Sequence, residues 1–392
     1  MKRNIIKGGI MKRIKDCLAI ILTCIMTFSM SACDFESGKI VLENVTKAKN
    51  VILLIGDGMG PNQVLAGEIY KGEKLAMQNF PYTVRVSTNN ALDEVTDSAA
   101  GATALATGTR TWNGYVGLNP DEEELTTIVD IATSMGKRTG ILTTEELYGA
   151  TPMSFSGHSI SRSNKAELIE SAAKNSNVNL FASYTYESVY QDIFSENGYT
   201  KIVAASEISK SKQDKIFGAY NVKASAKSMT AGEEVAFDYL VTEALEYLSQ
   251  DEDGFFLMAE GAHIDHGGHN NDINYMLEEL LAFDDAVNAA VKWAKKHKDT
   301  VVIVAADHET GGLYVCHEAN KDTLLKEEHG GYPFNYSWST TGHTDSDIIC
   351  FINGADIDFS KYYNRLDMMS YNRVRIKNTD IFDIMKTLLK GE

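Results

Sequence analysis

Carboxylate and imidazole side chains lie at the ends of four predicted strands in this sequence. The residues are Asp57 in LLIGDGMG, Glu260, Asp265 and His269 in FLMAEGAHIDHGGH, Asp307 and His308 in VIVAADHETGG, and His343 in STTGHTD. A carboxylate that closes an apolar strand is costly to bury unless it is paired or binds a cation. Histidines among acids favour zinc, and carboxylates with hydroxyls favour magnesium. Each motif alone is also typical of a structural turn, but the four together predict a metal site.

A second group of residues begins in VTDSAAGATALATG, residues 95–108, where Asp97 and Ser98 precede a run of small side chains. One interpretation is an ordinary helix N-cap, with small residues that allow close packing against a sheet. The other is that Ser98 handles an anion, because the first turn of a helix offers unpaired N–H groups and the positive end of the dipole. On this stretch alone both interpretations stay open.

The elements that must position these residues alternate between strand-like and helix-like patterns. The apolar runs include NVILLIG, RTGILTT, GFFLMAE and DTVVIVAAD, and helical patterns such as AELIESAAKN and INYMLEELLAFDDAVNAAVKWAKKH lie between several of them. This alternation predicts an α/β fold with a large, mostly parallel central sheet and helices on both faces. Ligands of such sheets bind beyond the C-terminal ends of the strands, which is where the acidic and histidine residues occur. Residues 163–231 give no clear pattern.

The first 32 residues differ from the rest of the chain. Six basic residues precede the apolar run CLAIILTCIMTFSMSAC, which is the pattern of a signal peptide. MSAC resembles a bacterial lipobox, so we expect lipidation of Cys33 and a polar tether over residues 33–49. An uncleaved anchor is the alternative, and both place the rest of the chain outside the cytoplasm.

Charge and cysteine content narrow the range of partners. The formal net charge of the 392 residues is −17, which argues against nucleic acid or an anionic membrane surface as a specific partner. After the predicted processing only Cys316 and Cys350 remain in the folded body. Two cysteines are too few for a fold that depends on a framework of disulfide bonds.

The motifs taken together resemble the alkaline phosphatases. Asp57 in GDGMG, Asp97 and Ser98 in TDSAAGATALATG, Thr151 in ATP, Arg162 in HSISR, and the segments EGAHIDHGGH, ADHETGG and TTGH occur in the order and approximate spacing of that family. The resemblance runs from Asn50 to His343, with a weaker match in NTDIFDIM. It implies a phosphoric monoester hydrolase over residues 50–392 with a small crown-type insertion. Residues 309–342 are expected to form an inserted loop or small subdomain, and a homodimer stays open.

The resemblance also implies a role for each site residue. It implies one zinc ion at Asp265, His269 and His343, a second zinc ion at Asp57, Asp307 and His308, and a magnesium ion at Asp57, Thr151 and Glu260. It implies Ser98 as the nucleophile, Arg162 as the phosphate clamp, Asp97 as the residue that positions Arg162, and His266 as a contact to phosphate through water. The implied substrates are phosphate monoesters.

Gly149 is the departure from the family's pattern near the metals, because relatives commonly carry Asp or His two residues before the threonine of ATP. We therefore expect water beside Gly149 and weakened magnesium binding.

Two rival functions are weighed against the monoesterase. One is a phosphodiesterase or another hydrolase of the same superfamily, and the other is a non-catalytic lipoprotein that binds phosphate or metal. Arg162 together with Glu260 and Thr151 favours the monoesterase, because a diester lacks the third charged oxygen that the extra positive charge would serve. A pure binder needs no nucleophile at a helix start.

Overall fold

The computed structural model describes residues 45–224, 234–316, 332–357 and 375–391. Every described residue belongs to one unit, Ile40–Glu392, the second of the two into which the chain divides. The predicted signal peptide, Cys33 and most of the predicted tether lie outside the described residues. Within the described ranges, no helix has both the length and the apolar character needed to cross a bilayer.

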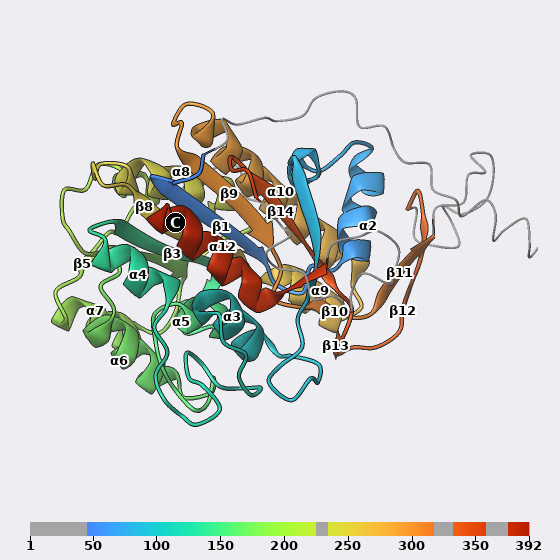
Figure 1. Cartoon of the computed structure of the whole chain (residues 1–392), viewed down its shortest axis with the longest axis horizontal. Coiled ribbons are helices and arrows are strands. Elements are labelled where there is room, and N and C mark those ends of the chain that lie inside the picture. The colour runs from blue at the N-terminus through green and yellow to red at the C-terminus, as the bar shows by residue number, and fades with distance from the viewer. Residues whose placement is uncertain (1–44, 225–233, 317–331, 358–374, 392) are drawn as a thin grey trace, which may run out of the picture. The chain divides into compact units, whose positions relative to one another are not determined.

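An 11-stranded sheet runs through the second unit (Figure 1). Its strands are β1 (Asn50–Gly56), β2 (Tyr82–Ser87), β3 (Arg138–Glu146), β4 (Leu180–Tyr184), β5 (Thr200–Lys201), β6 (Ile216–Val222), β7 (Glu234–Val235), β8 (Phe255–Gly261), β9 (Thr300–Ala305), β14 (Ile348–Asn353) and β15 (Arg375–Lys377). The order is β15-β2-β14-β9-β1-β8-β3-β4-β6-β5, with β7 beside β6. β14 is antiparallel to both its neighbours, and the other described pairings in this sheet are parallel. The prediction of a mostly parallel sheet is confirmed.

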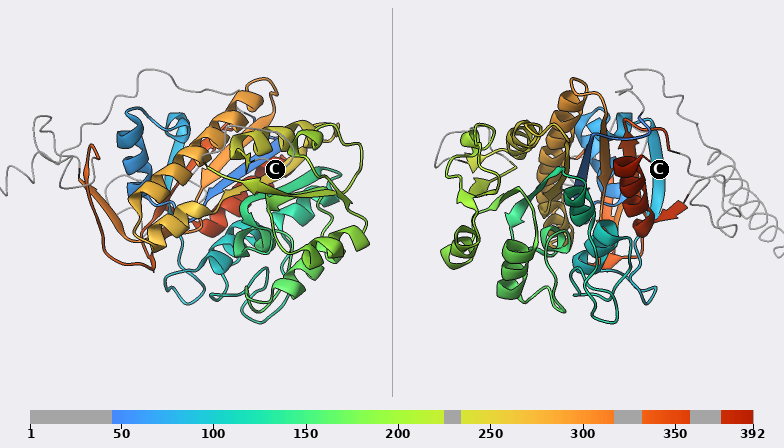
Figure 2. Two further views of the ribbon diagram at one scale, coloured as in Figure 1. Left: turned by 180° about the vertical axis from the view of Figure 1, so that it is seen from behind. Right: turned by 60° about the vertical axis from the view of Figure 1, so that its left-hand side comes forward.

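Helices cover both faces of the sheet (Figure 2). They are α2 (Pro61–Lys71), α3 (Ser98–Thr107), α4 (Ile128–Ser134), α5 (Ala150–Ser154), α6 (Lys165–Asn175), α7 (Ser188–Glu196), α8 (Phe237–Leu248), α9 (His263–His269), α10 (Ile273–Ala294) and α12 (Asn378–Lys390), with short 3₁₀ turns η1 (Ala76–Asn79) and η2 (Ala205–Glu207). α10 packs against α2 and α8, whereas α12 packs against α3 and α4. Every residue of β1 and β8 is buried, as expected for central strands covered on two sides.

Residues 163–224, the described part of the segment whose sequence gave no clear pattern, continue the sheet at one edge. β4, β5 and β6 extend the parallel order beyond β3. An aromatic cluster holds this edge: the ring centroids of Phe181 and Phe194 are 5.0 Å apart, and those of Phe194 and Phe217 are 5.6 Å apart. Packing of these rings stabilises this edge of the sheet.

Residues 309–342 form short antiparallel pairs in the part that the structure describes. β10 (Glu309–Thr310) pairs with β13 (His343–Thr344), and β11 (Leu313–Cys316) pairs with β12 (Asn335–Trp338). Residues 317–331 of the expected insertion lie outside the described residues. Cys316 at the end of β11 and the buried Cys350 in β14 are both free thiols.

Helix α3 packs closely against the end of β9 because its residues are small. All ten of its residues are buried. A Cβ added at Gly101 would lie 2.9 Å from the backbone carbonyl oxygen of Asp307, which is closer than a methyl group tolerates. Gly101 is therefore small because α3 packs closely against Asp307, as the first of the two interpretations of this segment expects.

We expect Gly101→Ala to lower the free energy of unfolding by about 1–3 kcal/mol, because the new methyl group must displace backbone. Urea unfolding of the metal-free protein measures this change. Gly342→Ala is the matched control, since a Cβ there meets nothing closer than 3.6 Å. Equal stabilities of the two variants would contradict the close packing of α3.

Candidate metal and phosphate site

The register of four neighbouring strands brings the predicted site residues to one edge of the sheet. β9, β1, β8 and β3 are consecutive and parallel, so their C-terminal ends coincide. Ile55 in β1 pairs with Glu260 on one side and Ala305 on the other. Asp57, which follows β1, therefore lies between the ends of β8 and β9 (Figure 1).

The six residues implied as zinc ligands form two clusters. The first contains Asp265, His269 and His343, and the second contains Asp57, Asp307 and His308. In each cluster, one nitrogen or oxygen atom from every residue lies within 4.8 Å of the others. No other such group occurs among the described residues. Catalytic zinc sites are typically built from three protein ligands, among them imidazole and carboxylate groups.

The Asp265 cluster combines a helix with a short strand. Asp265 and His269 lie four residues apart in α9, on one helix face, and Nε2 of His269 is 3.3 Å from Oδ2 of Asp265. His343 enters from β13, and its Nε2 is 3.5 Å from Oδ1 of Asp265 and 3.1 Å from Nε2 of His269. Two ring nitrogens that face the same carboxylate are arranged to share one cation.

The Asp57 cluster is built from the ends of β1 and β9, and all its members are buried. Nε2 of His308 lies 3.3 Å from Oδ2 of Asp307 and 3.5 Å from Oδ1 of Asp57. Those two carboxylate oxygens have no hydrogen-bond partner. Burial lowers the pKa of His308 well below its ordinary value, so the ring is neutral, as a metal ligand must be.

The three histidines of the clusters are oriented by contacts to Nδ1, the ring nitrogen that faces away from the cluster. These contacts are to the carbonyl oxygen of Thr96 for His343 at 2.9 Å, to the carbonyl oxygen of Thr341 for His269 at 2.5 Å, and to the hydroxyl of Thr310 for His308 at 3.2 Å. A carbonyl oxygen only accepts, so Nδ1 of His269 and of His343 carries the proton. In the metal-free protein the hydrogen bond to Asp265 raises the pKa of His269 to about 9, and the pKa of His343 is raised as well. A bound cation would displace the proton from Nε2, and contacts at Nδ1 such as these are typical of metal-binding histidines.

The acidic groups of the two clusters repel one another. Burial raises the pKa of Asp57 well above its ordinary value, and the charges of Asp307 and Asp265 raise it further. Burial also raises the pKa of Asp307 to about 7, with the charge of Asp265 as the next cause. Burial acts in the same direction on Asp265, but its hydrogen bonds to His269 and His343 outweigh burial and hold its pKa well below the usual range. Bound cations would neutralise this repulsion.

Oxygen ligands for a third cation lie beside the Asp57 cluster. Glu260, at the end of β8, accepts a hydrogen bond from the Thr143 hydroxyl to its Oε2 at 2.5 Å. Its Oε1, Oγ1 of Thr151 in α5, and Oδ1 of Asp57 are buried and have no hydrogen-bond partner. Three orphaned oxygens fit a hard cation such as magnesium, because buried polar atoms without partners are costly.

The space beside Gly149 is filled by a protein side chain. A Cβ at position 149 would lie 1.9 Å from Oε1 of Glu145. The expectation that water fills this space is therefore wrong. The reason is local: Glu145 ends up beside Gly149 because β3 runs on to Glu146 and the chain then turns directly into α5.

Ser98 is the first residue of α3, and its buried Oγ lies 3.1 Å from Nε2 of His308. Asp97 caps the same helix, since its Oδ1 accepts a hydrogen bond from the N–H of Ala100 at 2.9 Å. Oδ2 of Asp97 accepts a hydrogen bond from Nη1 of Arg162 at 3.3 Å. The motif therefore serves both interpretations: Asp97 is the cap, and the hydroxyl of Ser98 faces the metal-ligand cluster.

His266 lies away from these contacts. Its side chain is exposed, and its ring centroid lies 4.9 Å from that of His263. None of the hydrogen bonds or ion pairs found among the described residues joins it to Ser98 or Arg162. The contact of His266 to phosphate through water stays a prediction.

Thr310 and Thr143 are site residues that the sequence reasoning missed. The Thr310 hydroxyl donates to Oδ1 of Asp265, and the Thr143 hydroxyl donates to Glu260. Both lie within motifs already singled out, two residues after His308 and at the end of a predicted strand. A threonine next to a buried acid was the available signal, because such an acid needs donors.

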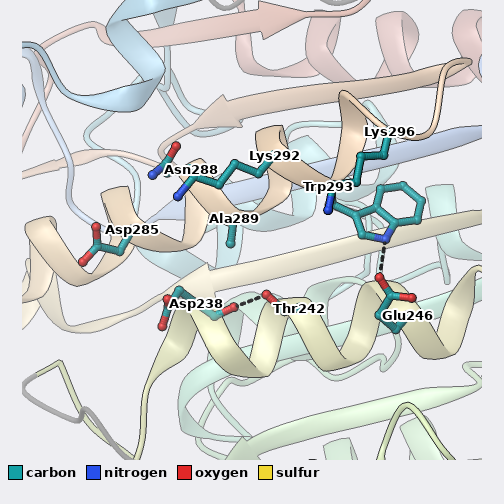
Figure 3. A pocket seen from close by; sticks show the side chains of 9 residues that line it. All are labelled: Asp238, Thr242, Glu246, Asp285, Asn288, Ala289, Lys292, Trp293 and Lys296. Carbon is teal, nitrogen blue, oxygen red and sulfur yellow. Dashed lines mark hydrogen bonds between the residues drawn. The ribbon is translucent and has the colours of Figure 1, made fainter.

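A pocket of about 310 Å³ lies between α8 and α10 (Figure 3). Asp238, Glu246, Lys292 and Trp293 are among its lining residues, and the indole nitrogen of Trp293 donates to Glu246 at 3.1 Å. None of its lining residues belongs to either cluster, so the pocket is separate from the candidate site.

Comparison with known proteins identifies the family. The profile of the family described as Alkaline phosphatase matches residues 48–193 and 187–329. Alkaline phosphatase 3 of Bacillus subtilis is 33% identical over 292 residues, which are 69% of this chain and 63% of that protein. The alkaline phosphatase of Escherichia coli is 30% identical over 348 residues, covering 71% of this chain and 74% of that protein. The chain belongs to the alkaline phosphatase family.

A solved structure extends this likeness to the fold. One similar structure is that of a variant of TAB5 alkaline phosphatase with magnesium bound in its M3 site. The alignment covers 88% of this chain and 98% of the TAB5 chain, with a TM-score of 0.72 and 29% sequence identity. The match to the Bacillus subtilis relative spans just under two thirds of that protein's length, at 63%.

We expect the metal-free protein to lose thermal stability as pH rises. The folded state keeps a proton on Asp307 up to about pH 7, whereas an ordinary aspartate releases it near 3.8. It also keeps a proton on His269 up to about pH 9, against an ordinary value of 6.5, because of its hydrogen bond to Asp265. The lowered pKa of His308 opposes this trend below its ordinary value of 6.5. Above pH 6.5 the folded state binds more protons than the unfolded chain, so its stability falls as pH rises.

Thermal unfolding of the chelated protein across this pH range measures the trend. Added zinc should reverse it, because metal binding requires the deprotonated ligands. A melting temperature of the chelated protein that rises between pH 6.5 and 9, or is the same throughout that range, would contradict the charge distribution of the two clusters.

Proposed function

We propose that the chain is an alkaline phosphatase that hydrolyses phosphate monoesters to an alcohol and inorganic phosphate through a phosphoserine on Ser98. The observation that carries this proposal is the 3.1 Å distance between Oγ of Ser98 and Nε2 of His308, a member of the Asp57 cluster. It places a hydroxyl, at the first residue of a helix, against a group of metal-ligating side chains. Membership of the alkaline phosphatase family supports the same reaction.

Three cations complete the proposed site. Asp265, His269 and His343 would hold one zinc ion, Asp57, Asp307 and His308 a second, and Asp57, Thr151 and Glu260 a magnesium ion. The orphaned oxygens of Asp57, Asp307, Glu260 and Thr151 support this assignment, and so does the magnesium in the M3 site of the TAB5 variant. When bound, such cations lower the pKa of a neighbouring hydroxyl, neutralise phosphate oxygens and stabilise the departing alkoxide.

Ser98 is the proposed nucleophile. Its Oγ forms a bond to phosphorus while the bond from phosphorus to the alcohol oxygen breaks, and the alcohol leaves with a proton. A water molecule then attacks the phosphoserine, which releases phosphate and restores the hydroxyl. The N-terminal end of α3 favours the negative phosphoryl group at this position, and the small side chains of Ala99 and Ala100 follow Ser98.

Arg162 is the proposed phosphate clamp. Its side chain is 40% exposed, so part of it faces the solvent from which substrate arrives. Asp97 fixes one edge of the guanidinium through Nη1, and the fork can hold two phosphate oxygens at once. Asp97 is itself held by the N–H groups of Ala100 and Gly114, so it positions Arg162 from a rigid point.

The rival functions fit these contacts less well. A phosphodiester carries one charged oxygen fewer, so it makes poorer use of Arg162 together with a third cation at Glu260 and Thr151. A binding protein without activity has no use for a buried hydroxyl against metal ligands. We therefore favour the monoesterase.

We expect the zinc- and magnesium-loaded protein to hydrolyse p-nitrophenyl phosphate far faster than bis-p-nitrophenyl phosphate. Ser98→Ala should lower kcat for the monoester by about 10³-fold or more, because only the attacking oxygen is removed. Steady-state kinetics measures both. Zinc content and phosphate affinity of Ser98→Ala are the controls and should match those of the wild type. Undiminished turnover in Ser98→Ala, or preference for the bis-ester, would contradict the proposal.

We further propose that the protein is extracytoplasmic and anchored through a lipid on Cys33. The supporting observation is the basic and apolar pattern of residues 1–32, which ends in MSAC. In a bacterial host the wild type should sediment with membranes, and Cys33→Ser should appear in the soluble fraction or as an unprocessed precursor. A soluble wild type whose first residue lies well beyond Cys33 would contradict the anchor.

A further inference from the structure

Glu145 lies beside the third cation site, and the roles assigned above do not use it. It is half-buried near the end of β3, two residues after Thr143. β3 is irregular between Leu142 and Glu146, where its register with β4 shifts, and the Thr143 hydroxyl in this stretch donates to Glu260. The N–H of Glu145 in turn donates to the Thr143 hydroxyl at 3.2 Å.

The Glu145 carboxylate points toward the start of α5. A Cβ at Gly149 would lie 1.9 Å from its Oε1 and 2.7 Å from its Cδ. Gly149 is the N-cap of α5, and Thr151 follows two residues later in the same helix. A side chain at position 149 would occupy the space that the Glu145 carboxylate takes, at the start of the helix that carries Thr151.

The oxygens around this carboxylate have no partners of their own. Oε1 of Glu260, which is fully buried, and Oγ1 of Thr151, which is 1% exposed, make no hydrogen bonds. Among the described residues, no hydrogen bond or ion pair to the Glu145 carboxylate is found either. Its charge acts on its neighbours all the same: after burial it is the largest cause that raises the pKa of Glu260, and it also raises the pKa of Asp57.

We propose that Glu145 is a cation-binding residue of the third site, where its carboxylate joins Asp57, Thr151 and Glu260 in holding hydrated magnesium. This inference rests on the proposed function and adds a residue to it. It also replaces the expectation that the glycine at position 149 weakens magnesium binding. The supporting carboxylate is that of Glu145 in β3, and no side chain at the start of α5 is needed.

The charge count explains why such a site selects magnesium. Glu145, Asp57 and Glu260 are carboxylates, Thr151 adds a hydroxyl, and none of the four offers a nitrogen or sulfur atom. Magnesium prefers oxygen ligands and keeps several of its waters, which need acceptors such as carboxylates around them. The two clusters that contain histidine retain zinc by the same reasoning.

The test is a calorimetric titration of magnesium chloride into the zinc-loaded protein. We expect Glu145→Gln to weaken magnesium binding by about 10–100-fold, the range that is typical when a supporting group of a metal site is lost. Zinc content should stay as in the wild type. Glu146→Gln is the matched control, because it removes the same charge from the next residue and should change magnesium affinity by less than about threefold.

An exchange of positions tests the placement of the carboxylate. Glu145→Ala should lose magnesium affinity, and the double variant Glu145→Ala with Gly149→Asp should regain most of it, since Asp then supplies a carboxylate to the same space. Gly149 has φ −53° and ψ 151°, a conformation that aspartate adopts freely. Gly149→Asp alone should bind magnesium more weakly than the double variant, because its side chain collides with Glu145.

Unchanged magnesium affinity in Glu145→Gln, or no recovery in the double variant, would overturn the assignment of Glu145. Hydrolysis of p-nitrophenyl phosphate by the wild type separates this failure from a failure of the proposed function. If the wild type is active and Glu145→Gln binds magnesium normally, only the role of Glu145 is wrong. If the zinc-loaded wild type is inactive, the proposed function is wrong.

Discussion

The repulsion among carboxylates at the ends of β1, β8 and β9 is the constraint on which the rest of this structure depends. Asp57, Glu260 and Asp307 end neighbouring parallel strands whose register leaves them side by side. Burial raises the pKa of each of them, so the metal-free fold favours their protonated forms, and ionising all three together carries a large cost. Such an arrangement is costly unless positive charge arrives, which ties the central sheet to cation binding.

The surrounding elements can be understood as responses to that constraint. Three histidines turn Nε2 toward the acids because contacts to their Nδ1 atoms fix the rings. Helix α3 has a glycine where it meets Asp307, so that its first residue, Ser98, reaches the same cluster. The fold thus combines a concentrated negative charge with a nucleophile and a guanidinium, and bound cations would convert the negative centre into one that accepts a phosphate dianion.

Much of this could be predicted from the sequence, because the strands that carry the site are apolar on both faces and end in acids. NVILLIG, GFFLMAE and DTVVIVAAD form β1, β8 and β9 within one or two residues of the expected bounds. The edge formed by β4 to β6 could not be predicted, since β5 has only two residues and the edge depends on contacts between Phe181, Phe194 and Phe217. The position of the Glu145 carboxylate could not be predicted from the sequence either, because it depends on how the chain turns from β3 into α5 and not on any local pattern.

Anomalous X-ray diffraction at the zinc absorption edge, from crystals of the zinc-loaded protein grown with phosphate, tests the central claim most directly. The account predicts two zinc peaks, one among Asp265, His269 and His343 and one among Asp57, Asp307 and His308, with phosphate in contact with Ser98 and Arg162. Zinc bound elsewhere, a single peak, or phosphate that does not contact Ser98 would contradict it.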